Sequence, residues 1–288
     1  MAAIDPELVE RVKMSKAGRQ SSPLRYRDRS RVAFVVHSFN RAVNIDQLVS
    51  GLRRIDGHEL IVCDDGSLDD SREKWMSHLV QPNDFLILSN DLHEIRILDR
   101  AIRFASADII CLVQDDDVIP HETSWLDCAL GEFKKHSNLA IIGGFMGFYG
   151  IDLSPIKTSE SAIWGETSFQ FVDHVNIGPY FIRKQHYEAL GGWDFSFSHV
   201  GEPGICFDSE LCLRAWVHGY QVGYRFVPFK GPPNQYSLDG GTMLFSEEAR
   251  FRNQWQNHSK IFEMYGGHAP RIAELVRNAN RSVGHVVD

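Results

Sequence analysis

Short apolar runs alternate with amphipathic segments from Arg31 to about residue 133, and this alternation constrains the fold more than any other feature. The first run, 32–36, is wholly apolar, as in a strand that is buried on both faces. Ile45, Leu48 and Leu52 then recur at helical spacing. The same pattern predicts strands at 60–63, 85–88 and 109–113, and helices at 69–80, 94–105 and 125–133. This order predicts an α/β fold in which a mostly parallel sheet lies between helices.

The second half of the chain has a different pattern. Strand-like stretches at 143–150, 168–183 and 220–229 are interrupted by glycine, proline and aromatic residues. We expect a smaller mixed or antiparallel region here, with helices at 209–218 and 251–265.

Composition excludes several classes of protein. The formal net charge of -8 argues against a surface that binds nucleic acid. No run approaches the roughly 18 apolar residues of a transmembrane segment, and the N-terminus lacks the apolar stretch of a secretory signal. The five cysteines lie without zinc-binding spacing. We therefore expect free thiols and a cytoplasmic location.

Residues 1–30 are predicted to form a basic N-terminal extension. Residues 1–31 hold eight basic and four acidic side chains, whereas the whole chain is acidic. The extension could contact an anionic membrane surface or an acidic partner. A solvated extension is the alternative that composition favours.

Acidic residues follow the second predicted strand. Asp64, Asp65, Gly66 and Ser67 come directly after the run 61–63. In parallel sheets ligands bind at the carboxyl ends of the strands, where a carboxylate can accept hydrogen bonds from a base or a ribose. The alternative is that an aspartate here caps a turn and the following helix.

Three consecutive aspartates, Asp115, Asp116 and Asp117, follow the fourth predicted strand. Adjacent carboxylates repel one another at neutral pH, so we expect a positive charge beside them. Mn²⁺ or Mg²⁺, bridging to diphosphate oxygens, would supply that charge. In an extended segment Asp115 and Asp117 would point to the same side and bind the metal together. A solvated loop is the less favoured alternative, because the triplet follows an apolar strand.

Five motifs, in this order, resemble the GT-A fold of the family 2 glycosyltransferases over most of the chain. They are 35–41 (VVHSFNR), 64–67 (DDGS), 115–117 (DDD), 191–194 (GGWD) and 208–214 (DSELCLR). The resemblance implies a Rossmann-like, mostly parallel central sheet flanked by helices, with a smaller mixed or antiparallel acceptor-side region. It further implies a catalytic domain at 31–230, composed of a nucleotide-binding half (31–120) and an acceptor-binding half (121–230). A lid loop at 231–241 and a C-terminal helical segment would make up residues 231–288.

The resemblance also implies an activity. A sugar would move from a nucleotide diphosphate donor, expected to be a UDP-sugar, to a hydroxyl of a carbohydrate or glycoconjugate acceptor. The cofactor would be Mn²⁺ or Mg²⁺, and direct displacement would invert the anomeric centre.

The predicted site residues fall into four groups. The nucleotide-binding residues are His37, Ser38, Asn40, Arg41, Asp65 and Asp115. The metal ligands are Asp115, Asp117 and His258, and the sugar- or acceptor-binding residues are Trp193, Asp194, His174 and Asn176. Asp208 is the predicted catalytic base, with a helix N-cap as its alternative role and Glu210 as the second candidate. For Trp193 and for the histidines, a place in the core or on the surface is the alternative.

The chain departs from the family pattern in two places. Many relatives carry an Arg-Asn pair on the third helix, where this chain has Leu98-Asp99, with Arg96 and Arg100 nearby. Gln114 precedes the aspartate triplet, so which two of the three aspartates bind the metal stays open. The triplet also resembles the metal motif of the exostosin-type transferases, which retain stereochemistry.

Two other functions are compatible with the sequence. A sugar-1-phosphate nucleotidylyltransferase would need a glycine-rich phosphate loop after the first strand, and the segment 37–41 has no glycine. An inactive carbohydrate-binding module would have no reason to keep Asp115, Asp117 and Asp208.

Overall fold

The computed structural model describes residues 31–90, 94–149, 161–165, 168–198, 202, 204–227, 229 and 247–285. The predicted N-terminal extension and the predicted lid at 231–241 lie outside these residues.

The central sheet has eight strands in the order β3-β2-β1-β4-β10-β5-β11-β8. Its first half is parallel and consists of β1 (Val32–Ser38), β2 (His58–Asp64), β3 (Asp84–Leu88) and β4 (Ile109–Gln114). Its second half consists of β5 (Leu139–Gly143), β8 (Gln170–Phe171), β10 (Tyr180–Arg183) and β11 (Gln221–Tyr224). In this half β10 and β8 are antiparallel to their neighbours, and β11 is parallel to β5.

A second, antiparallel sheet has the strand order β7-β6-β9. It is formed by β6 (Met146–Tyr149), β7 (Ser161–Trp164) and β9 (His174–Val175). The predicted α/β architecture, with a mostly parallel sheet and a smaller antiparallel region, is therefore confirmed.

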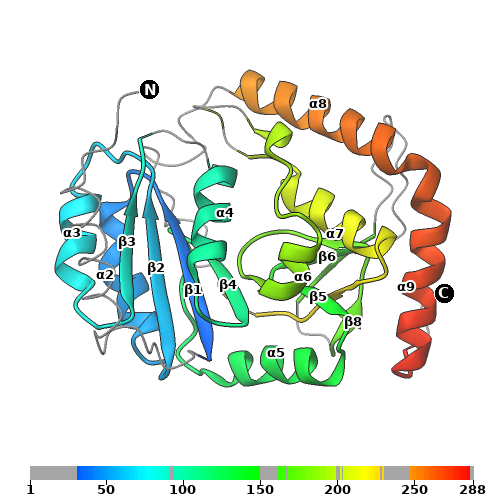
Figure 1. Cartoon of the computed structure of the whole chain (residues 1–288), viewed down its shortest axis with the longest axis horizontal. Helices are drawn as coiled ribbons and strands as arrows, with labels where there is room; N and C mark the ends of the chain where they lie inside the picture. Colours follow the sequence, from blue (N-terminus) through cyan, green and yellow to red (C-terminus); the bar gives the residue numbers. More distant parts are fainter. Residues whose placement is uncertain are drawn as a thin grey trace, which may run out of the picture.

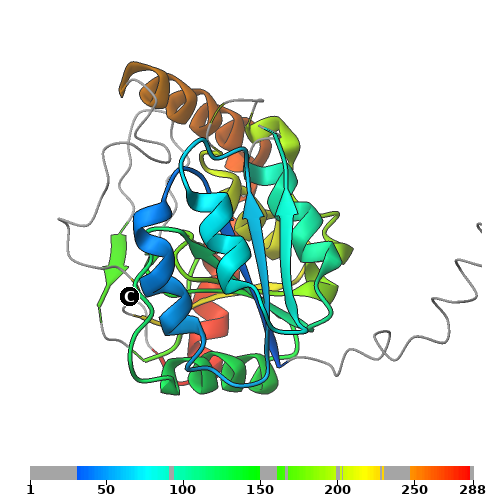
Figure 2. The same cartoon turned by 90° about the vertical axis from the view of Figure 1, so that its left-hand side faces the viewer.

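Helices cover both faces of the parallel half (Figures 1 and 2). One face carries α2 (Ala42–Leu52) and α3 (Ser71–His78), and the other carries α4 (Glu94–Phe104). Crossovers between parallel strands are right-handed, so the steps from β1 to β2 and from β2 to β3 place their helices on the same face. The step from β3 back to β4 runs the opposite way and places α4 on the other face. The strand order therefore reverses between β1 and β4, which is where such sheets bind ligands.

Further helices follow the parallel half of the sheet, and the last described segment of the chain is helical. The helices that follow β4 are α5 (Ser124–Lys135), α6 (Lys184–Ala189), η2 (Phe195–Phe197) and α7 (Phe207–Val217). The C-terminal elements are α8 (Glu247–Tyr265), η5 (Gly266–His268) and α9 (Ala269–Ser282), which lie along the top and right of Figure 1. The predicted helix at 251–265 is confirmed, whereas α9 was not separately predicted.

All five cysteines are free thiols, as predicted. Among the described residues, no helix is long and apolar enough to cross a membrane.

Helix α9 closes the edge of the central sheet at β8. The Asn280 side chain accepts a hydrogen bond from Phe171 N at 2.9 Å and donates one to Phe171 O at 2.7 Å. Because Asn280 is fully buried, its amide takes the place of a neighbouring strand at this edge.

Replacing Asn280 with alanine is therefore expected to destabilise the fold. The two backbone groups of Phe171 would lose their partners in a buried place, which costs about 2–4 kcal/mol in the free energy of unfolding. Urea denaturation measures this loss. Asn278→Ala, an exposed position on the same helix, is the matched control and should have little effect.

Candidate active site

Three loops meet where β1, β2 and β4 end. The carboxylate of Asp115 accepts a hydrogen bond from Phe39 N at 2.9 Å, and Asn44 Nδ2 donates to Asp115 O at 3.1 Å. Asn40 N donates to Ser67 Oγ at 3.0 Å. The loop after β1 is thus hydrogen-bonded to both acidic clusters, which the sequence separates by about fifty residues.

Asp64 and Asp65 have different roles in the second loop. Asp64 Oδ1 accepts from Ser67 N at 3.1 Å and so closes the turn, as the capping alternative predicted. The Asp65 carboxylate accepts from the Ser89 hydroxyl and lies 3.7 Å from His37 Nε2. Asp65 therefore lies just beyond the carboxyl end of β2, beside His37, another of the predicted nucleotide contacts.

His37 lies among several carboxylates. Burial lowers its pKa, but the Asp65 carboxylate, 3.7 Å from Nε2, and the negative charges of Glu94 and Asp115 outweigh burial and raise the pKa above the usual value. Burial raises the pKa of Glu94, and the charges of Asp208 and Asp65 add to that rise. Glu94 thus belongs to the same electrostatic cluster.

Glu94 was not among the predicted site residues. It begins α4, the helix that follows β3, and accepts a hydrogen bond from Gly204 N at 3.3 Å. The rule that ligands bind at the carboxyl ends of parallel strands could have found Glu94, had it been applied to β3 as well as to β2 and β4.

The aspartate triplet forms a turn, which corrects the prediction of an extended segment. Asp117 N donates to Gln114 O at 3.1 Å, and Asp117 Oδ2 accepts from Gln114 N at 2.8 Å. The Asp117 carboxylate therefore folds back on the end of β4 and is almost fully buried. Strand alternation does not decide which side Asp115 and Asp117 point to, because the segment is not a strand.

Asp115 has an unusual protonation equilibrium. Burial raises its pKa to about 7, and the neighbouring Asp116 adds to the rise. The Phe39 amide, His37 and Arg41 act in the opposite direction. The local positive groups thus compensate the charge of the triplet only in part.

The oxygen ligands of the triplet fit a hard divalent cation. No group of three or more His, Cys, Asp or Glu side chains suited to a metal occurs within the described residues. A Mg²⁺ site on a phosphate substrate needs only one or two protein carboxylates, since phosphate oxygens and water complete the shell. The carboxylates at 115–117 fit such a shared site.

Asp208 lies in the first turn of α7, which begins at Phe207, two residues before its predicted start. The N-cap residue is Cys206, so the alternative role of Asp208 as an N-cap is wrong. Asp208 Oδ2 accepts from Ile177 N at 3.2 Å. Burial raises the pKa of Asp208. The charge of Asp208 also raises the pKa of Glu94. Asp208 therefore belongs to the same cluster of carboxylates at the sheet edge.

The loop at residues 190–198, called the acceptor loop after its predicted role, contains the Gly-Gly-Trp-Asp motif. Trp193 is buried, with its ring edge-on to Tyr187 at 5.4 Å and to Phe207 at 4.9 Å. Asp194 Oδ1 accepts from Ser196 N at 2.9 Å and caps η2. Both residues support the loop itself, and their contacts with a ligand stay predictions.

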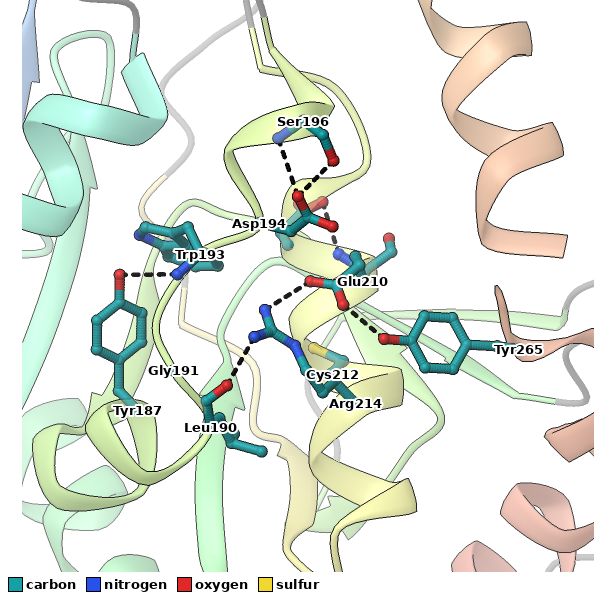
Figure 3. A network of polar contacts seen from close by, with 12 residues as sticks. Tyr187, Leu190, Gly191, Trp193, Asp194, Ser196, Glu210, Cys212, Arg214 and Tyr265 are labelled. Atoms are coloured by element: carbon teal, nitrogen blue, oxygen red, sulfur yellow. Dashed lines mark hydrogen bonds and ion pairs between the residues drawn. The ribbon is translucent and has the colours of Figure 1, made fainter. Parts of the chain in front are cut away.

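Asp99, where relatives carry part of an Arg-Asn pair, holds this loop in place. Its Oδ1 accepts from the Tyr187 hydroxyl at 2.7 Å, and its Oδ2 accepts from Arg103 Nε at 2.9 Å. Tyr187 in turn accepts from Trp193 N at 3.1 Å, as Figure 3 shows. The guanidinium of Arg96 lies over the Phe195 ring, 5.0 Å from the ring centroid, and so also contacts this loop.

Three predicted residues lie away from the cluster or beneath it. The Ser38 side chain is fully buried and accepts from Trp75 Nε1 at 2.9 Å, so it does not reach the surface of the site. His174 is buried and stacks on Phe148 at 4.5 Å; burial, followed by the charge of His258, lowers its pKa to about 3. His258 therefore interacts with His174, and its role as a metal ligand gains no support from this arrangement.

The three remaining predicted residues, Asn40, Arg41 and Asn176, lie in or next to the loops of the site. Asn40 Oδ1 accepts from Leu68 N at 2.7 Å, and Asn40 itself has a left-handed backbone with φ of 53°. Arg41 is buried, and its charge lowers the pKa of Asp115. Asn176 N donates to Met146 O at 3.3 Å. The next residue, Ile177, is the one whose amide donates to Asp208.

The sheet and the position of this cluster are those of a nucleotide-binding α/β protein. The family model described as glycosyl transferase family 2 matches residues 33–194, which is more than half of the chain. The chain therefore belongs to glycosyl transferase family 2, as the motifs predicted, and it is a glycosyltransferase. The match ends at Asp194 and does not include Asp208.

Solved structures with similar folds include three glycosyltransferases of low sequence identity. A mannosyltransferase from Pyrobaculum calidifontis in complex with GDP-Man and Mn²⁺ is 14% identical, over 96% of this chain and 83% of its own, with a TM-score of 0.49. S. aureus TarS 1–349 in complex with UDP is 15% identical, over 89% of this chain and 76% of that 1–349 chain, with a TM-score of 0.48. Glucosyl-3-phosphoglycerate synthase from Mycobacterium tuberculosis in complex with UDP is 13% identical, over 81% of each chain, with a TM-score of 0.49. No match was found among curated protein sequences.

Gly192 offers a test of how tightly the acceptor loop is held. Its φ is +82°, and an added Cβ would lie 2.6 Å from both Asp99 Oδ1 and Arg103 Nη2. Gly192→Ala should therefore cost about 2–4 kcal/mol in the free energy of unfolding, from backbone strain and overpacking together.

Gly219→Ala is the matched control. Its φ is +83°, but an added Cβ there would have no neighbour within 4 Å. It should cost only the backbone strain, about 1–2 kcal/mol. Equal losses in the two variants, measured by urea denaturation, would contradict a tightly packed loop.

Proposed function

We propose that the protein transfers a sugar from a nucleotide diphosphate donor, a UDP-sugar, to an acceptor hydroxyl, with a divalent metal and with inversion by direct displacement. The observation that carries this proposal is the single cluster of Asp65, Glu94, Asp115 and Asp208 at the point where the strand order reverses. The residues proposed to bind the nucleotide, to bind the metal and to accept the proton would then lie in one site.

The donor would bind across the carboxyl ends of β1, β2 and β4. Asp65 would accept a hydrogen bond from the base or the ribose, and His37 would lie beside it as a proton donor. The raised pKa of His37 favours its charged form, which suits an anionic diphosphate. Arg41 adds a second positive charge close to Asp115.

Asp115, together with Asp117 or Asp116, would hold Mn²⁺ or Mg²⁺. When bound, the cation neutralises the charge that develops on the leaving diphosphate. The Phe39 amide keeps the Asp115 carboxylate in place at 2.9 Å. The metal-binding role of His258 is the weakest part of the predicted ligand set, because His258 interacts with His174.

Asp208 would take the proton of the acceptor hydroxyl as that hydroxyl attacks the anomeric carbon. Its carboxylate is held by the Ile177 amide, and burial raises its pKa toward the range in which a carboxylate accepts protons efficiently. Attack from the face opposite the diphosphate inverts the anomeric centre without a covalent intermediate. The acceptor loop, with Trp193 and Asp194, would lie beside the incoming acceptor, and His174 and Asn176 would lie near the donor sugar.

The acceptor would be a carbohydrate or glycoconjugate, and the reaction would take place in the cytoplasm. Five free thiols support a reducing compartment. The proposed domain limits, 31–120 for the donor half and 121–230 for the acceptor half, follow the change from the parallel half of the sheet to the mixed half.

Nucleotide release from a panel of UDP- and GDP-sugars, with and without Mn²⁺, tests this function. Transfer that depends on Mn²⁺ is the expected result. Release of pyrophosphate from a nucleoside triphosphate and a sugar 1-phosphate would identify a nucleotidylyltransferase. Metal-independent sugar binding without turnover would identify a binding module.

Replacement of both Asp115 and Asp117 with alanine should lower kcat/KM by roughly 100-fold or more, since charge stabilisation at a leaving group contributes on this scale. It should also weaken Mn²⁺ binding, measured by titration calorimetry. Asp56→Ala is the matched control, because Asp56 is exposed at the opposite end of the sheet, just before β2. Unchanged turnover and Mn²⁺ affinity in the double variant would refute the proposed function.

The pH dependence of kcat/KM should report Asp208. A base must be ionised to accept a proton, and the raised pKa keeps Asp208 protonated to a higher pH than an ordinary aspartate. Activity should therefore fall as the pH is lowered through a pKa above the usual value of 3.8. Asp208→Asn should abolish this acidic limb together with most of the activity, and an unchanged profile would exclude Asp208 as the base.

A further inference from the structure

Helix α8 contacts the acceptor loop and its continuation with polar side chains. Asn257 Nδ2 donates to Phe197 O at 3.0 Å and to Ile205 O at 2.8 Å. Asn253 Nδ2 donates to Glu202 Oε2 at 2.9 Å, and Lys260 Nζ lies over the Phe197 ring at 4.4 Å. These three residues recur at helical spacing and so form one side of α8.

The opposite side of α8 is apolar and faces outward. Phe251, Trp255 and Phe262 have exposed fractions of 68%, 66% and 40%. Ile261, which is 3% exposed, is a buried apolar side chain of this stretch. The hydrogen bonds from Asn253 and Asn257 add directional contacts between α8 and the loop.

Tyr265, at the end of α8, extends these contacts into α7. Its hydroxyl donates to Glu210 Oε1 at 2.6 Å, and Arg214 Nη2 donates to Glu210 Oε2 at 2.7 Å. Arg214 Nη1 donates to Leu190 O at 2.7 Å, at the start of the acceptor loop. Figure 3 shows this continuous chain of contacts from α8 through α7 to the loop.

Glu210 is the centre of this network. It is 1% exposed, and both oxygens of its carboxylate already accept strong hydrogen bonds. A buried carboxylate requires such partners, because ionisation without them is very costly. Glu210, the second candidate for the catalytic base, therefore holds other side chains rather than accepting a proton from the acceptor.

The network acts on the same helical turn that carries Asp208. Positions 208 and 210 lie about 200° apart around an α-helix, so Asp208 and Glu210 face opposite sides of α7. Asp208 binds the Ile177 amide, whereas Glu210 binds Tyr265 and Arg214. The turn starts at Cys206, which has a φ of 64° and no side-chain capping bond. Contacts of the side chains must therefore fix the orientation of this turn.

We propose that Tyr265, Glu210 and Arg214 are positioning residues that set Asp208 relative to the acceptor loop. The C-terminal helices are then a working part of the acceptor site, although they lie beyond the residues that match the family model. This inference rests on the proposed function of Asp208 as the base. None of the three residues touches the reacting atoms.

Tyr265→Phe removes one hydroxyl and keeps the ring. We expect kcat/KM for the acceptor to fall about tenfold, mainly through kcat, since small displacements of a base cost rate more than binding. The affinity for UDP with Mn²⁺ should not change, because loops after β1, β2 and β4 form the donor edge. Amide hydrogen exchange in 204–213 should become faster.

Tyr149→Phe is the matched control, since it removes a hydroxyl that bonds Gln170 at 2.6 Å in another part of the fold. It should leave the acceptor kinetics and the exchange of 204–213 unchanged. A double-mutant cycle with Glu210→Gln adds a second measure. The effects of Tyr265→Phe and Glu210→Gln on kcat should be clearly non-additive if both act through one contact.

A Tyr265→Phe enzyme that melts at a lower temperature but keeps wild-type kcat, acceptor KM and exchange of 204–213 would overturn this inference, as would additive effects in the cycle. Absence of transfer by the wild-type enzyme would refute the proposed function instead. The exchange measurement needs no turnover, so it tests the network in either case.

Discussion

The burial of several carboxylates at one edge of the sheet is the constraint on which the site depends. Burial raises the pKa values of Glu94, Asp115 and Asp208 together, and their charges act on one another. His37 and backbone amides offset part of this repulsion. A diphosphate is itself an anion and would be repelled by such an edge. In the proposed function, binding of the donor would therefore be favourable only together with a cation, which is the physical reason to expect a metal here.

The topology explains why these groups meet. Right-handed crossovers move outward from β1 to β3 and then return to β4, so the strand order reverses between β1 and β4. No helix can cover the carboxyl ends at that reversal, and the loops after β1, β2 and β4 pack against one another instead. The hydrogen bonds between those loops, each of which joins a backbone group to a side chain, form a frame that connects the loops. Asp65 and Asp115 extend from this frame, so their separation is determined by the register of the strands.

Features that depend on the periodicity of apolar residues could be predicted from the sequence. Features that depend on contacts between side chains distant in the sequence could not. Buried strands have apolar runs, so the strand ends and the two acidic clusters could be placed. The turn at 115–117 depends on the bond between Asp117 and Gln114 N, which a periodic pattern does not contain. The packing of the Trp193 ring against Tyr187 and Phe207 likewise depends on residues distant in the sequence, while its contact with a ligand stays a prediction. The contact of Tyr265 with Glu210 joins residues 55 positions apart, and no local signal predicts it.

The two halves of the proposed site are held by different sets of contacts, and this separation bears on specificity. Hydrogen bonds from backbone amides to side chains of neighbouring loops hold the proposed donor half, at residues that match the family model. Side-chain contacts from α4, α7 and α8 hold the proposed acceptor half, including Asp99 with Tyr187 and Glu210 with Tyr265. A substitution in a side-chain network can reorient a loop and leave the sheet unchanged. In the proposed function, acceptor preference could therefore change without loss of the donor site, because the contacts that hold the two halves involve different residues.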